Sequence, residues 1–198
     1  MGRHCRGGRS PNHSLAWACM ASAQEDLTAT DVGGALRYSA RYNRAPDLFL
    51  GESTWPALYC GLTYGVCLAE ILRHLTPSTL PSLKNQRLSE ISVDLSAMLD
   101  CTDLAALGVD EAALFDDYDY STGQTLAAAA IARGCEALLI PSATRLPDPN
   151  LIIFTTRVQS SSSYRAIGFV DPPPLRRSSA PALDGRFHDH AERLCFST

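Results

Sequence analysis

The sequence lacks the features that mark membrane, nucleic-acid-binding and metal-binding proteins. No apolar run approaches the roughly 18 residues that a membrane-spanning helix requires. The net charge is −4, so no overall positive field attracts nucleic acid or an anionic membrane. His188 and His190 flank Asp189, but no further ligands complete a zinc pattern around them. We therefore expect a protein that acts without a metal ion, nucleic acid or a membrane.

Common nucleotide-binding and hydrolase motifs are also missing, and no internal repeat is present. The chain has neither a Gly-x-Gly-x-x-Gly loop, nor a Walker A loop, nor a Gly-x-Ser-x-Gly elbow. Its seven cysteines form no Cys-x-x-Cys pair, and their number is odd. Since Cys60, Cys67 and Cys135 lie in apolar segments, we expect reduced thiols that pack as small hydrophobic groups. This cysteine usage indicates a cytoplasmic protein.

What is present indicates one globular domain with two irregular ends. The chain has 198 residues, of which 45% are hydrophobic, and a domain of about 100–150 residues is the natural expectation. Residues 1–34 are rich in Arg, Gly and small side chains, and their apolar stretch is too short or interrupted for a signal peptide of the usual kind. Residues 159–198 contain a serine run and three consecutive prolines. We therefore predict a disordered leader over 1–34, a domain over 35–158 and an irregular tail over 159–198.

The segment from Pro56 to Leu75 is the one around which the rest is organised. Pro56–Cys60 is short, apolar and aromatic, which predicts a buried strand. Thr63 can then cap a helix that starts at Tyr64. Residues at helical spacing form one apolar stripe: Tyr64, Cys67, Leu68, Ile71, Leu72 and Leu75. Glu70 lies on the flank of this stripe, so its carboxylate can face either a cleft or water.

Further elements are predicted on both sides of this segment. Leu36–Asn43 favours a strand followed by a loop, and Asp110–Tyr120 is typical of a solvated acidic loop. Met98–Leu107 favours a connecting loop with a helical turn. The expected regular elements are a strand at Ser89–Leu95, a helix from Ser121 to Arg133 with a Ser121–Gln124 capping box and Gly134 at its end, and strands at Cys135–Ile140 and Asn150–Thr155.

The candidate functional residues are Arg37, Arg41, Tyr59, Glu70 and Ser142. Each has an ordinary structural explanation as well. The two arginines can be solvated loop residues, Tyr59 can belong to the core, and Ser142 can be a turn residue at the end of a strand. Glu70 can pair with Arg73 or His74 on its own helix. Periodicity alone does not bring these residues together.

Their order along the chain resembles the RES domain, a family named for an Arg, a Glu and a Ser. The three residues here are Arg37 or Arg41, Glu70 and Ser142. The resemblance runs from about Ala35 to Thr156 and rests on these motifs in this order: Ala40-Arg41-Tyr42-Asn43, Leu58-Tyr59, Leu68-Ala69-Glu70, the Gly134 to Ala143 segment with Ala137-Leu138-Leu139 and Pro141-Ser142-Ala143, and Asn150 to Phe154.

This resemblance implies an α+β fold like that of ADP-ribosyltransferases, a small mixed, split sheet with flanking helices. It implies an enzyme that cleaves the nicotinamide–ribose bond of NAD and passes ADP-ribose to phosphate or water, as the toxin of a toxin–antitoxin pair. NAD would be the substrate, no metal would be needed, and an antitoxin protein would be the partner. Two alternatives remain: transfer of ADP-ribose to a protein acceptor, and a RES-like module that binds without catalysis.

The resemblance also implies roles for single residues. Glu70 would stabilise positive charge on the ribose ring, and Arg37 and Arg41 would hold phosphate oxygens. Tyr59 would offer a flat face to the nicotinamide ring, with Tyr42 also among the NAD-binding residues. Ser142 would donate a hydrogen bond to the carboxamide or to an incoming phosphate.

One departure affects the arginines. The usual box of the family is Gly-Arg-Trp-Asn with a second arginine well upstream, whereas here Ala40-Arg41-Tyr42-Asn43 replaces the box and Arg37 lies only four residues before Arg41. Either the intervening loop has been lost, or Arg37 is the early arginine and the second box is degenerate. Which of the two clamps phosphate stays open at this point.

Overall fold

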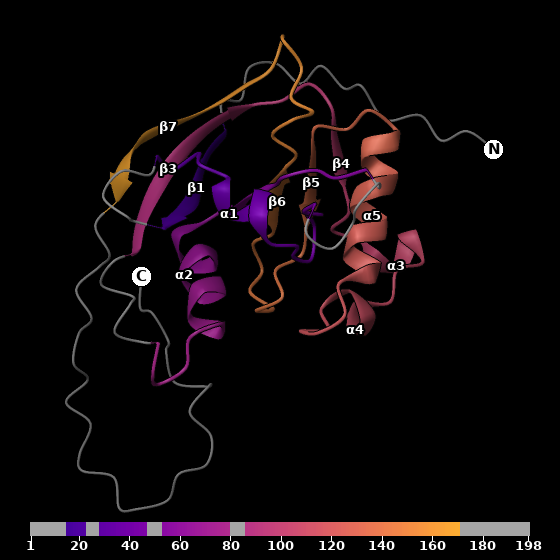
Figure 1. Cartoon of the computed structure of the whole chain (residues 1–198), viewed down its shortest axis with the longest axis horizontal. Helices are drawn as coiled ribbons and strands as arrows, with labels where there is room; N and C mark the ends of the chain where they lie inside the picture. Colours follow the sequence, from indigo (N-terminus) through magenta and orange to yellow (C-terminus); the bar gives the residue numbers. More distant parts are fainter. Residues whose placement is uncertain (1–14, 23–27, 47–52, 80–85, 171–198) are drawn as a thin grey trace, which may run out of the picture.

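A computed structural model of the chain describes residues 15–22, 28–46, 53–79 and 86–170 (Figure 1). The strands are β1 (Leu15–Ser22), β2 (Leu58–Gly61), β3 (Gln86–Asp94), β4 (Met98–Asp100), β5 (Ala137–Ile140), β6 (Asn150–Ile153) and β7 (Ser163–Val170). The helices are α1 (Gly33–Arg37), α2 (Tyr64–Arg73), α3 (Leu104–Leu107), α4 (Glu111–Leu114) and α5 (Ser121–Ala132).

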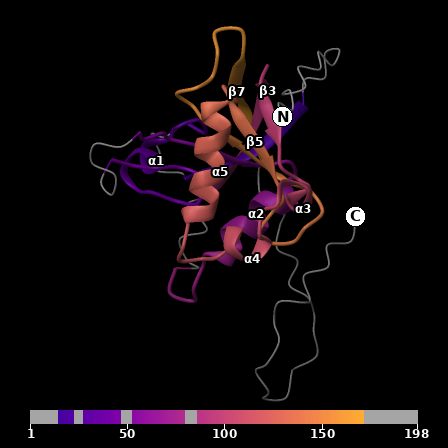
Figure 2. The same cartoon turned by 90° about the vertical axis from the view of Figure 1, so that its right-hand side faces the viewer.

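The strands form one mixed sheet in the order β4-β5-β6-β2-β1-β3-β7. Strands β4 and β5 run parallel, and every other neighbouring pair is antiparallel. The helix α2 lies beside β2 and β1, whereas α5 lies beside β5 at the other side of the molecule (Figure 1, Figure 2). The predicted α+β class, with a mixed sheet and flanking helices, is confirmed.

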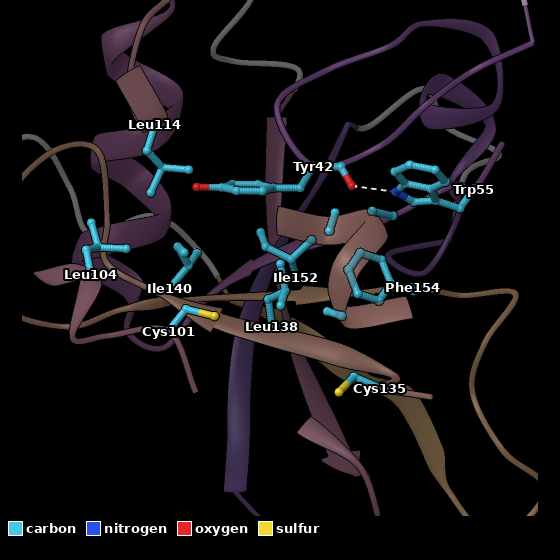
Figure 3. Close-up of a cluster of buried hydrophobic side chains, with 13 residues drawn as sticks. Tyr42, Trp55, Cys101, Leu104, Leu114, Cys135, Leu138, Ile140, Ile152 and Phe154 are labelled. Carbon is cyan, nitrogen blue, oxygen red and sulfur yellow. Dashed lines mark hydrogen bonds between the residues drawn. The ribbon is translucent and has the colours of Figure 1, made fainter. Parts of the chain in front are cut away.

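Alternation along β5 and β6 supplies hydrophobic side chains to both faces of the sheet. Leu138 and Ile152 point into one buried cluster together with Trp55, Tyr42 and residues of α5 (Figure 3). The neighbouring positions along the same two strands point into a second cluster that includes Leu58 and Ile91. A period of two along a strand has this consequence, because successive side chains leave opposite faces. Burial on both faces makes β5 and β6 the centre of the molecule.

The helix α2 follows its predicted pattern closely. Thr63 caps it, and the Thr63 side chain accepts a hydrogen bond from the Val66 N–H. Cys67 and Ile71 are buried and pack against Leu88 of β3. The helix ends at Arg73, and the apolar stripe leaves Glu70 on its flank, as predicted.

Two strands lie outside the boundaries predicted for the domain. Strand β1 falls within the stretch expected to be a disordered leader, and β7 falls within the stretch expected to be an irregular tail. Both pair with β3, antiparallel to it. Main-chain hydrogen bonds to a neighbouring strand hold such segments even where the side-chain pattern is weak. The prediction of irregular structure fails for these two strands, while the rest of both predicted segments lies largely outside the described residues.

Two shorter segments also differ from the prediction. The strand expected at Leu36–Asn43 is absent, since α1 covers Gly33–Arg37 and a turn follows. The Asp31 carboxylate accepts a 2.6 Å hydrogen bond from the Gly33 N–H and so starts the helical turn. The expected loop at Met98–Leu107 contains the short strand β4 in addition to the predicted helical turn, α3.

Among the described residues, none of the helices has the length and apolar character needed to cross a membrane. The same part of the chain holds no group of three or more His, Cys, Asp or Glu side chains suited to a metal ion. His188 and His190 lie outside the described residues.

Candidate active site

Glu70 lies at an end of the sheet where three strands meet. Strand β2 ends with Gly61, β5 ends with Ile140, and both of these residues pair with Asn150 at the start of β6. The helix α2 begins three residues after Gly61 and returns over this end of the sheet. The second turn of α2 therefore brings Glu70 to the connection between β5 and β6.

One oxygen of the Glu70 carboxylate is held by three donors from that connection. Glu70 Oε1 accepts hydrogen bonds from the Ser142 hydroxyl at 2.7 Å, the Asn150 amide at 2.8 Å and the Ala143 N–H at 3.1 Å. The other oxygen, Oε2, lies 3.6 Å from Arg73 Nη1 in an ion pair, the helix pair that the sequence offered as the ordinary explanation of Glu70. The Glu70 side chain is 23% exposed. Its carboxylate is thus fixed in orientation and still reachable from outside.

The Ser142 hydroxyl is fully engaged in this arrangement. Ser142 is 2% exposed, and its single hydroxyl proton is donated to Glu70. The same oxygen accepts from the Thr144 N–H at 3.1 Å and lies 2.6 Å from the Thr144 hydroxyl. One donor and two acceptor positions exhaust the capacity of a hydroxyl. In this structure Ser142 therefore acts on the orientation of Glu70.

Arg41 lies in a pocket made by the loop before α5. Its Nη2 donates to the carbonyl oxygens of Phe115 at 3.2 Å and Asp116 at 2.8 Å. Its guanidinium carbon lies 5.8 Å from the ring centres of both Phe115 and Tyr120. A Cβ on Gly123 would overlap the Arg41 carbonyl oxygen, so the glycine allows α5 to approach this backbone closely. Arg41 is consequently immobilised by main-chain and aromatic contacts.

The residues next to Arg41 form a rigid turn that depends on Tyr59 and Asn43. The Tyr59 hydroxyl accepts from the Tyr42 N–H at 2.9 Å and donates to Asn43 Oδ1 at 3.0 Å. The Asn43 amide in turn donates to the carbonyls of Ala35 and Tyr38. Burial raises the pKa values of both Tyr42 and Tyr59 well above their usual range. Both phenols therefore stay protonated, and the hydroxyl of Tyr59 holds this turn in place.

Gln124 supports the same turn instead of capping its own helix. The predicted capping box is wrong: the helix α5 has Tyr120 at its N-cap position and no side-chain cap bond. The buried Gln124 amide donates to the carbonyls of Ala40 at 3.1 Å and Asn43 at 3.2 Å. Main-chain carbonyls away from water need donors more than a helix terminus that water can reach.

An acidic residue connects the Arg41 region to Glu70. Asp117 forms an ion pair with Arg41 at 3.5 Å and a second, close one with Arg73 Nη2. Arg73 in turn pairs with Glu70. Four charged side chains from three segments thus form one continuous network. Of the two arginines predicted from the sequence, Arg41 is part of it, whereas Arg37 is exposed on α1 and forms no hydrogen bond or ion pair with Arg41, Glu70 or Ser142 among the described residues.

A hollow of about 520 Å³ opens beside this network. It is lined by Asp110, Glu111, Ala112, Phe115, Ala143 and Arg145. Ala143 contributes the N–H that binds Glu70, and Phe115 contributes the carbonyl that binds Arg41. The volume is within the range of about 300–1,000 Å³ that is common for small-molecule sites. None of the five candidate residues lines this hollow, which reaches the network only through Ala143 and Phe115.

Comparison with known proteins agrees with this geometry. The RES domain matches residues 15–178, which is most of the chain. The chain belongs to the RES family. The match begins and ends outside the predicted limits of 35–156 and includes both β1 and β7. A search of curated proteins found no match.

The fold of this RES domain also resembles solved structures, of which seven chains match. One is a chain of the M. tuberculosis MbcT–MbcA toxin–antitoxin complex, with a TM-score of 0.63 and 23% sequence identity. The alignment covers 81% of this chain and 86% of that chain. At this level of identity the similarity establishes the fold.

Sequence reasoning missed three residues of this part of the RES domain: Asn150, Asp117 and Gln124. The sequence places Asn150 at the start of a strand and within a motif of the RES resemblance but gives it no role in the site, although an Asn directly after Pro149 is an unusual choice there. Asp117 was read as one of several solvated acidic residues, and no local signal distinguishes it from Asp116 or Asp119.

Proposed function

We propose that this chain is an NAD-consuming enzyme that cleaves the nicotinamide–ribose bond and transfers ADP-ribose to phosphate or water. The observation that carries the proposal is the Glu70 carboxylate, fixed by three donors on one oxygen at a partly exposed position in a RES domain. Fixing a glutamate side chain in one orientation costs conformational entropy, and an ordinary surface glutamate has no partners that offset this cost. The three hydrogen bonds to Glu70 therefore favour a role at a reacting centre.

The chemistry accounts for the need for a fixed carboxylate. As the bond between the nicotinamide nitrogen and the ribose carbon breaks, the electron pair leaves with nicotinamide, and positive charge develops on the ribose ring. Glu70 would stabilise that charge. A phosphate or water oxygen then forms the new bond to the same carbon, and with water a proton is released to solvent. A preorganised charge is effective here because it need not reorganise during the reaction.

The arginines and tyrosines would position the substrate. We propose that Arg41, held in place by its carbonyl and ring contacts, binds phosphate oxygens of NAD. The Tyr59 hydroxyl is hydrogen-bonded to Tyr42 and Asn43. Only the half-buried ring of Tyr59 would therefore face the nicotinamide. Tyr42 is 4% exposed and would support the site from the core. Arg37 is exposed on α1, so it would reach the substrate only from the solvent-exposed side of the site.

A role as a toxin is part of the same proposal. A structurally similar chain comes from a toxin–antitoxin complex. We propose that this chain depletes NAD in its host cell and is restrained by an antitoxin protein. Induced expression of the wild-type chain should then slow bacterial growth and lower cellular NAD, whereas unchanged growth and NAD at a confirmed level of folded protein would contradict the toxin role.

The test of the enzymatic proposal compares two Glu to Gln variants. Glu70→Gln removes the negative charge but keeps the shape, and we expect it to lower the rate of NAD loss at least about 100-fold. Glu90→Gln in β3, a half-buried glutamate outside the charge network, is the matched control and should retain the wild-type rate. If both variants consume NAD as fast as the wild type, the role of Glu70 is refuted.

A further inference from the structure

Two arginines from separate elements converge on one carboxylate close to Glu70. Arg41 comes from the turn before β2, Arg73 from the last turn of α2, and Asp117 from the loop before α5. The two arginine side chains are only 11% and 20% exposed, whereas Asp117 is 59% exposed. Two mostly buried cations therefore share an acidic partner that reaches in from the surface.

This carboxylate does not satisfy the two guanidinium groups. Arg41 Nε and Arg73 Nη1 are buried and have no hydrogen-bond acceptor among the described residues. Arg73 Nη1 lies 3.6 Å from Glu70 Oε2, which is too long for a hydrogen bond. Buried donors of this kind are normally paired, and a buried unpaired donor is a reason to look for an acceptor that binds there. The pair has donors for more oxygens than one carboxylate can supply.

A phosphate group fits these donors better than Asp117 does. Its oxygens are arranged tetrahedrally, so separate oxygens can accept from Arg73 and from Arg41 Nε at once, while Arg41 Nη2 keeps its two carbonyl acceptors. Asp117 is mostly exposed to solvent, and an ion pair formed with such a residue is weak because water and salt screen it. Exchange of this carboxylate for a multiply charged ligand would therefore meet little resistance.

We propose that Arg41 and Arg73 form a phosphate-binding site, which Asp117 occupies in the ligand-free protein and from which it is displaced on binding. The proposal rests on the proposed function, because the site adjoins Glu70, and it adds Arg73 and Asp117 to the residues that govern substrate binding. The ligand chemistry is a phosphate oxyanion, supplied either by the diphosphate of a dinucleotide or by inorganic phosphate as the acceptor.

The experiment is a calorimetric titration of the full chain with two probes, ADP-ribose for the diphosphate and inorganic phosphate for the acceptor. We expect Asp117→Asn to lower the dissociation constant about fivefold for the probe that uses the site. We expect Arg73→Gln to raise it about tenfold or more. In the double variant the gain from Asp117→Asn should be lost. The probe that responds identifies the source of the phosphate.

Asp119→Asn is the matched control. Asp119 lies in the same loop, but its carboxylate accepts hydrogen bonds from the N–H and the side chain of Ser121, and an Asn side chain retains an acceptor oxygen. An equal gain in this variant would show a general charge effect and overturn the proposal, as would an unchanged dissociation constant for both probes in Asp117→Asn. Asp117 is exposed, so its variant provides a valid test even if Arg73→Gln fails to fold.

The outcome is separable from that of the proposed function, because the readout is binding. A gain in Asp117→Asn without NAD turnover would support the phosphate site and contradict the enzyme. Turnover that depends on Glu70 without that gain would support the enzyme and contradict the phosphate site.

Discussion

At the scale of single residues, the feature that separates Glu70 from an ordinary helix glutamate is where its hydrogen bonds come from. All three donors to Oε1 belong to the connection between β5 and β6 or to the start of β6, 72 to 80 positions away along the chain. Hydrogen bonds to a charged group contribute about 1.5–3 kcal/mol each. Their combined effect is to fix one rotamer of Glu70 against the end of the sheet.

The first prediction concerns Ser142, which we describe as a positioning residue. Ser142→Ala removes the shortest of the three hydrogen bonds to Glu70, and we expect kcat for NAD loss to fall about tenfold or more while KM changes little. The reason is that a less ordered carboxylate stabilises the developing charge less well, whereas substrate binding depends on other groups. Steady-state kinetics of NAD loss provide the measurement.

The control is Ser92→Ala, a serine of β3 for which the structure gives no side-chain hydrogen bond among the described residues. It should leave kcat and KM unchanged. A Ser142→Ala variant that keeps the wild-type kcat would contradict the positioning role. So would a variant whose lost activity is fully explained by a lower fraction of folded protein.

The sequence predicts the position of Glu70 on its helix well and its hydrogen-bond partners poorly, for a physical reason. The place of Glu70 on the flank of α2 follows from a helical period that is local to ten residues. The contact with Asn150 spans 80 positions and depends on how β2, β5 and β6 align, which no local pattern contains. Ser142 was predicted only through the resemblance to the RES family.

At the scale of elements, the close approach of α5 to the turn that carries Arg41 determines where Arg41 lies relative to Glu70. Gln124 binds two carbonyls of that turn, and Gly123 lies against the Arg41 backbone without room for a side chain. Tyr120 places its ring beside the Arg41 guanidinium. The start of α5 therefore holds the turn that carries Arg41 in place.

The second prediction concerns the close contact between Gly123 and the Arg41 backbone. Gly123→Ala places a methyl group against backbone atoms of Arg41, and we expect the free energy of unfolding to fall by about 1–3 kcal/mol. Gly65→Ala in α2, where the nearest atom to an added Cβ is 3.9 Å away, should instead be neutral or stabilising by up to about 1 kcal/mol. Urea unfolding of both variants provides the measurement, and equal stability of the two would contradict this description of α5.

The elements that the sequence predicts correctly are those with local signals. The cap at Thr63 and the left-handed Gly134 after α5 both lie where expected. The strands β1 and β7 were missed, because each is held by pairing with β3 and the surrounding composition indicates disorder. Gln124 was assigned to a helix cap because the buried carbonyls it serves belong to a distant turn.

At the scale of the whole molecule, the buried Glu136 ties distant loops together. Its carboxylate accepts hydrogen bonds from the N–H groups of Ser96 and Ala97 between β3 and β4, and from Gln159 and Ser162 between β6 and β7. The residue is 0% exposed. Burial raises the pKa of this carboxyl, but the hydrogen bonds from Gln159, Ser162, Ala97 and Ser96 outweigh burial, so the pKa is lowered below its ordinary value of 4.5.

The third prediction concerns the pH dependence of stability. Because the pKa of Glu136 is lower in the folded state, its contribution is fully present above about pH 4.5 and is lost as the pH falls through the lower, folded value. We expect Glu136→Gln to be destabilised by at least about 2 kcal/mol at pH 7. The difference from wild type should shrink in acid. Unfolding curves at several pH values provide the measurement.

Glu90→Gln serves as the control here too, because Glu90 is half-buried in β3 and outside this set of hydrogen bonds. It should follow the wild-type dependence on pH. A Glu136→Gln variant that matches the wild type at pH 7, or a difference that grows in acid, would contradict the assigned role of Glu136.

The central claim is that the site around Glu70 breaks the nicotinamide–ribose bond of NAD. The most direct test is mass spectrometry of the products after the purified, folded chain is incubated with NAD and inorganic phosphate. We predict nicotinamide in equal amount to the NAD lost, together with ADP-ribose 1-phosphate, or with ADP-ribose if water is the acceptor. Intact NAD after prolonged incubation with and without phosphate would contradict the claim.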